Sequence, residues 1–225
     1  MAELGTARWP HVDGGLVVVP VGSVEQHGPH LPLNTDTTIA EAVADVVSDA
    51  WIAPPLAYGA SGEHEGFPGT VSLGRTALST ILVEYGRSIC RWADRVVFVN
   101  GHGGNGSALA EAVALLRYEG RDVAWFPCSI PGADAHAGRT ETSLMLHIAP
   151  EHVEIEAAVV GNTDPVATLM EHMTVSGVMS VSSSGVLGDP SGATPAEGTD
   201  LLAGLRQRFV SAVERWTPDD LGILR

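Results

Sequence analysis

The segment RVVFVN (Arg95–Asn100), the loop GHGGNG after it and the run SALAEAVALLRY (Ser107–Tyr118) decide the fold class. The first part is short, apolar and rich in valine, which is typical of a strand buried on both faces of a sheet. The last part is rich in alanine and leucine and predicts a helix. A strand, a glycine-rich loop and a helix in this order indicate an α/β protein with a parallel sheet.

The same alternation extends along the rest of the chain. Further short apolar runs predict strands at Leu16–Val21, Ile52–Leu56 and Asp122–Pro127. Apolar residues at helical spacing predict helices at Thr38–Ala50, at Thr76–Trp92, from about Thr140, and within Pro195–Trp216. We expect a mostly parallel sheet with helices on both faces, in a single domain over residues 1–225.

One stretch does not fit this pattern. Residues Thr174–Thr194 are rich in serine and glycine, and they fit either a loop or an irregular segment at the edge of the sheet.

Charge and composition exclude several classes of function. The chain of 225 residues carries a formal net charge of −15, which argues against binding of nucleic acid or an anionic membrane surface. Cys90 and Cys128 belong to no CxxC cluster, so we expect two reduced core thiols. The chain also shows no signal peptide and no apolar run of about 18 residues. These features predict a cytoplasmic protein.

Residues able to bind a metal or transfer a proton come after every expected strand. In chain order they are Glu25, His27 and Asp36, then Glu63, His64 and Glu65, then His102, then His136 and Glu141. Ligands of open α/β sheets bind beyond the carboxyl ends of the strands, where these loops meet. We therefore expect the four loops to build one site.

The residue types indicate a metal site. Histidine nitrogen and carboxylate oxygen suit Zn, Mn or Fe(II). Glu25 and His27 are one residue apart and can turn to the same side of an extended loop. Asp36 lies near the start of an expected helix. It could act as the N-cap of that helix, as a ligand whose two oxygens bridge two ions, or as both. Two bridged ions lower the pKa of a bound water and so provide hydroxide at neutral pH. A site of this kind is typical of a hydrolase.

Other interpretations stay open for each residue taken alone. Glu25 fits a solvated loop acid, and His27 and His102 fit structural histidines. We expect His30 to support a ligand. The loop GHGGNG fits a phosphate cradle, which would make the chain a nucleotide-binding protein. It matches neither GxxxxGK[ST] nor GxGxxG, so we expect its glycines to let the backbone approach the metals and the substrate.

Four blocks in order closely resemble the creatininase family of metal-dependent amidohydrolases, over about residues 19–146. They are VGSVEQHGPHLPLNTD, SGEHEGFPGTVSLG, FVNGHGGN and DAHAGRTETSLML. The resemblance implies a three-layer αβα sandwich, two divalent ions per chain and a homo-oligomer such as a hexamer. It also implies that Glu25 and His102 bind one ion, that His27 binds the other, and that Asp36 bridges them.

The chain departs from creatininase itself at one ligand. Creatininase has a metal-binding glutamate two residues after the histidine of its NGH motif, where this chain has Gly104. We expect Glu141 to supply the remaining carboxylate, and His136 to match the histidine of acid–base catalysis. The tryptophans that enclose creatinine in creatininase have no counterpart in or just after the HAG loop, so creatinine is not the expected substrate.

Further blocks, including YGASGEHEGFPGT, ALLRYEGRD and VLGDP, resemble one peptidase branch of the family. Its members act on a precursor peptide modified by a radical-SAM enzyme and release a crosslinked C-terminal Val–Tyr unit. That modified peptide is the expected substrate. Two alternatives stay open: an amidohydrolase or deformylase acting on a cyclic amide or formamide, and a metal- or nucleotide-binding protein without activity.

The resemblance and the loop positions together give an expected division of roles. His136 and Glu141 are the expected catalytic residues, with His136 giving a proton to the leaving amine. Glu63 and His64 would hold the substrate or line its pocket. Gly103, Gly104 and Asn105 would contact the substrate, in part through backbone N–H groups aimed at the developing oxyanion. Three roles stay open for Arg139, which are contact with a substrate carboxylate, contact with a neighbouring subunit, and exposure to solvent; of these we favour solvent.

Overall fold

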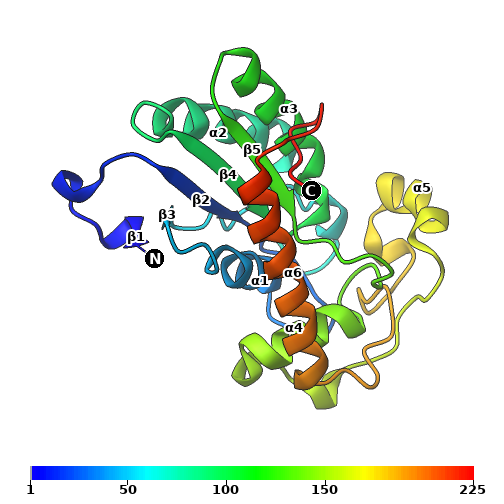
Figure 1. Cartoon of the computed structure of the whole chain (residues 1–225). Helices are drawn as coiled ribbons and strands as arrows, with labels where there is room; N and C mark the ends of the chain where they lie inside the picture. Colours follow the sequence, from blue (N-terminus) through cyan, green and yellow to red (C-terminus); the bar gives the residue numbers. More distant parts are fainter. Residues whose placement is uncertain (1) are drawn as a thin grey trace.

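The computed structural model describes residues 2–225 and contains a five-stranded parallel sheet (Figure 1). The strand order is β1-β3-β2-β4-β5, and every neighbouring pair is parallel. The strands are β1 (Ala2–Glu3), β2 (Leu16–Val21), β3 (Ala50–Ile52), β4 (Arg95–Asn100) and β5 (Val123–Pro127). The predicted parallel sheet is therefore confirmed.

Helices cover both faces of this sheet. One core contains side chains of α1 (Thr35–Ala44), α4 (Arg139–Ile148) and α6 (Pro195–Arg215). The core on the opposite face contains side chains of α2 (Gly74–Ile89) and α3 (Gly106–Tyr118). Figure 1 shows α6 and α4 together on one side and α2 and α3 on the other. The three-layer αβα sandwich is confirmed.

The valine runs explain why β2 and β4 lie at the centre. Successive side chains of a strand point to opposite faces. Val18 and Val97 accordingly pack into the core with α1, α4 and α6, while Val17 and Val96 pack into the core with α2 and α3. All four side chains are fully buried. Burial of each valine contributes about 1.5–3 kcal/mol, so both central strands are strongly stabilised.

The predicted strand at Ile52–Leu56 is wrong in position. The structure places β3 at Ala50–Ile52, and Leu56 forms only an isolated bridge to Val21. Pro54 and Pro55 lack the N–H groups that a ladder requires, so the regular ladder of β3 ends before them. The first helix also lies earlier than expected, at Thr35–Ala44 instead of Thr38–Ala50.

The serine- and glycine-rich region is mostly irregular, but its first residues belong to a helix that the sequence did not indicate. This helix, α5 (Val166–Ser176), is followed by the short 3-10 helix η7 (Val178–Ser180). Figure 1 shows α5 set to one side of the layered body. Further along, Leu187 forms an antiparallel bridge with His136. Among the described residues, no helix is both long and apolar enough to cross a membrane.

Candidate metal centre

The structure brings the five predicted metal ligands together at the carboxyl edge of the sheet. Glu25 and His27 lie in the loop after β2, and His102 lies in the loop after β4. Asp36 and Glu141 lie in the first turns of α1 and α4. Both carboxylates are therefore favoured by the positive ends of helix dipoles. Asp36 is not an N-cap, because Asn34 occupies that position and caps through no side-chain hydrogen bond.

Asp36 lies between two groups of side chains. Its Oδ2 is 3.3 Å from Nδ1 of His102, which is 3.2 Å from Oε2 of Glu25. Its Oδ1 is 3.2 Å from Nε2 of His27, which is 3.9 Å from Oε2 of Glu141. Within each group of three, one ligand atom per residue lies within 4.8 Å of the others. One carboxylate thus faces two adjacent positions, each with two further donors.

The donor set fits divalent cations. Glu25 is fully buried, and neither of its carboxylate oxygens has a hydrogen-bond partner. A buried ionised carboxylate without hydrogen bonds is costly unless a positive charge lies beside it. Nitrogen from two histidines and oxygen from three carboxylates form the mixed set that Zn, Mn and Fe(II) accept.

Without metal, protons on two histidines neutralise the carboxylates. Burial opposes protonation of His27, but the Asp36 carboxylate raises the pKa of His27 to about 10. Burial likewise opposes protonation of His102, yet Glu25 holds the pKa of His102 well above its usual value. Although burial raises it, His102 in turn lowers the pKa of Glu25 to about 2. Metal ions at these positions must therefore displace protons.

His136 lies beside the cluster as a neutral ring. Burial lowers the pKa of His136 to about 3, with a further contribution from His27. Its Nδ1 is 3.8 Å from Oε1 of Glu25, and its ring lies 4.3 Å from the His27 ring. Glu25, His27 and His136 form a third group of atoms within 4.8 Å of one another. This group competes with the two that share Asp36.

The residues predicted to bind substrate fall into two sets. Glu63, Gly103 and Gly104 line a cavity beside the cluster. His64 also borders the cavity, but its Nε2 lies 3.3 Å from Oε1 of Glu25. Asn105 does not line it.

The side chain of Asn105, a predicted substrate contact, is fully buried and bonds to backbone groups. Its amide donates to the carbonyl of Gly22 at 2.9 Å and accepts from the N–H of Ala60 at 2.8 Å. Asn105 therefore joins the loops that come after β2, β3 and β4. Sequence patterns do not show this role, because the partners come from distant segments.

Gly104 cannot carry the carboxylate found at this position in creatininase. A Cβ added there would lie 2.4 Å from Nε2 of His102 and 2.5 Å from the carbonyl oxygen of Ala60. Glu141 instead reaches the cluster from α4, where Ala137 N–H donates to its carboxylate at 2.6 Å. Burial raises the pKa of Glu141 to about 7.

Two further residues support the α4 side of the cluster. His30 is buried, and its Nε2 lies 2.9 Å from Oγ1 of Thr142, the residue after Glu141. Arg139 does not simply point to solvent, because its Nε donates to the Glu197 carboxylate at 2.8 Å. That contact joins α4 to α6.

The cavity beside the cluster has a volume of about 870 Å³. One side carries the polar residues described above. Another part of the lining is an apolar wall from α5 and η7, made of Val166, Met170, Met173, Val175, Val178 and Met179. We call these six residues the α5–η7 wall. No tryptophan lines the cavity. The wall was not predicted; its only sequence signal was the three methionines at positions 170, 173 and 179.

Comparison with known proteins identifies the family. The creatinine amidohydrolase (creatininase) family model matches residues 6–213. The chain belongs to the creatininase family and is a hydrolase that acts on an amide C–N bond. Two solved structures, "Creatininase Mn" and a mutant creatininase of "Zn-Zn type", are each 25% identical to this chain and superpose on it with a TM-score of 0.79. The first alignment covers 96% of this chain and 99% of the creatininase chain. The second covers 96% of this chain and 98% of the mutant chain.

Curated relatives separate two activities within the family. The mycofactocin precursor peptide peptidase of Mycolicibacterium smegmatis is 58% identical over 228 residues, covering 97% of this chain and 92% of the relative. The creatinine amidohydrolase of Pseudomonas putida is 33% identical over 177 residues, covering 64% of this chain and 68% of the relative. The sequence identity to the peptidase is higher, and the alignment covers more of this chain.

Proposed function

We propose that this chain is a metal-dependent peptidase that hydrolyses the modified mycofactocin precursor peptide and releases its C-terminal Val–Tyr-derived unit. The similarity to the curated peptidase over 97% of the chain supports this substrate. The observation that carries the reaction class is the position of Asp36 between two groups of buried donors. The proposal includes cytoplasmic action and a homo-oligomer, such as a hexamer.

The proposed centre holds two divalent ions, Zn, Fe or Mn. Glu25 and His102 would bind one ion, His27 and Glu141 the other, and Asp36 both. When bound, such ions lower the pKa of a water and polarise the amide carbonyl. Ser23 Oγ donates to Oδ2 of Asp36 at 2.6 Å and orients that carboxylate.

His136 is suited to move a proton beside the scissile bond. Its ring is neutral near pH 7, so Nδ1 can accept a proton during attack and return it to the leaving amine. Glu63, about one third exposed, faces the cavity and can receive the substrate's polar backbone groups. Gly103 and Gly104 also line the cavity, and we assign their backbone N–H groups to the developing oxyanion.

The α5–η7 wall favours the peptide over a small polar amide. Apolar and sulfur-containing side chains suit aliphatic and aromatic groups of a substrate. The Val–Tyr-derived unit offers both, whereas creatinine is small and was predicted to need enclosing tryptophans that are missing from this cavity. A family amidohydrolase acting on a cyclic amide or formamide remains the second candidate, because it would use the same five ligands.

The experiment is mass spectrometry of the metal-loaded protein incubated with the enzymatically crosslinked precursor peptide, with creatinine in parallel. We expect release of the C-terminal fragment, loss of release with a chelator, and no turnover of creatinine. An intact peptide in the presence of bound metal would contradict the peptidase. Turnover of creatinine would support the second candidate.

A further inference from the structure

Gln26 lies between two proposed ligands, yet its buried side chain points to two histidines that bind no proposed ion. Its Nε2 lies 2.8 Å from Nδ1 of His64 and 3.1 Å from the carbonyl oxygen of Gly185. The same Nε2 lies 3.0 Å from Nε2 of His136. The amide oxygen of Gln26 accepts from the N–H of Gly28 at 2.8 Å, which fixes which end of the amide is the nitrogen.

These contacts determine where the ring protons lie. Nε2 of His136 is 2.7 Å from the backbone oxygen of Gln26, which can only accept, so this nitrogen carries the proton. The two amide hydrogens of Gln26 then go to the two remaining acceptors, Nδ1 of His64 and the oxygen of Gly185. A neutral His64 must therefore carry its proton on Nε2. In this assignment the two amide hydrogens of Gln26 and the ring proton of His136 each have one acceptor.

The two rings consequently present opposite groups to Glu25. The unprotonated Nδ1 of His136 lies 3.8 Å from Oε1 of Glu25. The protonated Nε2 of His64 lies 3.3 Å from the same oxygen. His136 thus offers a lone pair beside the cluster, while His64 turns an N–H toward a proposed ligand carboxylate.

We infer that Gln26 is a positioning residue that fixes the Nε2–H tautomers of His64 and His136, so that His136 presents the lone pair of Nδ1, and His64 the N–H of Nε2, on the side of Glu25. This inference rests on the proposed function where turnover is concerned. It changes the expected role of His64 from holding substrate to facing the proposed ligand Glu25 from 3.3 Å. Partners of this kind fix ring orientation in metal sites, and their loss costs about 10–100-fold in activity or metal affinity.

The irregular segment after η7 supplies the last part of the group. Gly185 has a φ of 82°, in the left-handed region, and a Cβ there would lie 1.8 Å from the amide oxygen of Gln26. Two residues later, Leu187 N–H donates to the backbone oxygen of His136 at 2.9 Å. The serine- and glycine-rich stretch therefore holds Gln26 and His136 against each other.

The first test is a long-range ¹H–¹⁵N correlation spectrum of ¹⁵N-histidine-labelled, zinc-loaded protein, which distinguishes the two tautomers directly. Single substitutions to glutamine, H64Q and H136Q, assign the two resonances. We expect a protonated Nε2 and an unprotonated Nδ1 for both rings. A protonated Nδ1 on either ring would overturn the inference. This readout needs no substrate, so it stands even where the proposed peptide is not cleaved.

The second test is Gln26→Glu, which keeps the shape and removes the amide donors. The new carboxylate can only accept from Nδ1 of His64, so we expect that nitrogen to become protonated. Turnover of the peptide should fall about 10–100-fold in kcat, with KM and metal content little changed. The matched control is Asn162→Asp, which removes an amide donor to the carbonyl of Val181 away from the centre.

An unchanged His64 spectrum and full kcat in Gln26→Glu would contradict the positioning role. Equal losses in Gln26→Glu and Asn162→Asp would do the same, since they would report a general structural cost. If Gln26→Glu does not fold, the spectrum of the native protein still decides the inference.

Discussion

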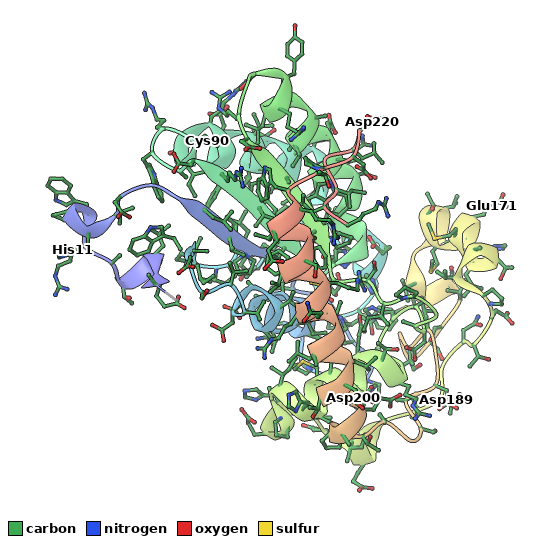
Figure 2. The ribbon with its side chains drawn as sticks, viewed as in Figure 1. His11, Cys90, Glu171, Asp189, Asp200 and Asp220 are labelled. Carbon is green, nitrogen blue, oxygen red and sulfur yellow. The ribbon has the colours of Figure 1, made fainter. Side chains whose placement is uncertain are left out.

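The metal cluster and the α5–η7 wall face the same cavity but are held in different ways. The proposed ligands come from the loops that follow β2 and β4 and from the first turns of α1 and α4. All of these ligands except Glu141 are nearly fully buried. In α5 only Leu169 is buried, and Val175 is 81% exposed. Figure 2 shows Glu171 on the outer side of α5, away from the layered body.

This contrast indicates which part of the cavity can vary. The cluster depends on the sheet, so a shift of β2 or β4 would disturb the chemistry. The wall residues of α5 are mostly exposed and can change their side chains without moving the ligands, whereas Val178 of η7 is buried. We expect changes in the cluster to abolish turnover and changes in the wall to alter substrate affinity.

The largest effect is expected for Asp36→Ala. Both proposed metal positions lose a shared ligand, so we expect fewer than two bound ions per chain. We also expect kcat/KM to drop by more than about 10⁴-fold, which exceeds the usual loss of activity when one acid–base group is removed. Metal content is measured by elemental mass spectrometry. The matched control is Asp45→Ala, which removes an exposed carboxylate just after the same helix. Two ions retained in Asp36→Ala would refute the shared position.

His136→Ala should come next. Loss of a proton-transfer group lowers kcat by about 10²–10⁴-fold, while the ligands that share Asp36 stay in place. We expect two ions per chain to remain bound. His172→Ala, an exposed histidine of α5, is the control. Near-normal turnover of His136→Ala with metal bound would exclude the proton-transfer role. Loss of metal would instead favour the third group, Glu25, His27 and His136.

Metal affinity should rise with pH. His27 is protonated below its raised pKa of about 10 in the metal-free protein, and an ion must displace that proton. Each displaced proton raises the apparent metal affinity about tenfold per pH unit. We therefore expect the affinity to rise about 100-fold between pH 6 and pH 8. Competition with a chelator of known affinity measures this slope. A slope of zero would show that His27 is not protonated before metal binds.

The same pKa predicts the opposite trend for stability of the metal-free protein. A raised folded-state pKa contributes stability that is complete below about pH 6.5 and is lost as pH rises toward about 10. Urea unfolding of the metal-free protein at pH 6.5 and pH 9 should therefore show a lower free energy of unfolding at the higher pH. A gain in stability over this range would contradict the ion pair of His27 with Asp36.

The smallest effect is expected in the wall. Met170→Glu places a charge where the apolar unit of the peptide is proposed to lie, and we expect KM to rise about tenfold, equivalent to about 1.4 kcal/mol. Metal content and kcat should stay within about twofold. The control is Glu171→Gln, the next residue, on the outer side of α5. A fall in kcat with unchanged KM would contradict the division between cluster and wall.

Parts of the fold were predictable because local and global preferences agree. The bounds predicted for β2 and β4 match the structure, since each is a valine run that ends at a glycine. The strand at Ile52–Leu56 was misplaced because apolar content concealed the effect of Pro54 and Pro55. Helix α5 was missed because its surface is exposed and only Leu169 is buried, so its sequence lacks a clear apolar stripe.

The candidate centre was predictable for a similar reason. Parallel strands bring their carboxyl ends together, so residues after each strand meet without knowledge of the loops. The roles of Asn105, His64 and Gln26 were not predictable, because each depends on a hydrogen-bond partner from a distant segment. Such partners become visible only once the loops are placed.

The most direct test of the shared position at Asp36 is anomalous diffraction from crystals of the zinc-loaded protein. We expect two zinc peaks per chain, each about 2.0–2.2 Å from a different oxygen of Asp36, with Glu25 and His102 on one and His27 and Glu141 on the other. A single peak held by Glu25, His27 and His136, with Asp36 not coordinated, would contradict the two-ion centre.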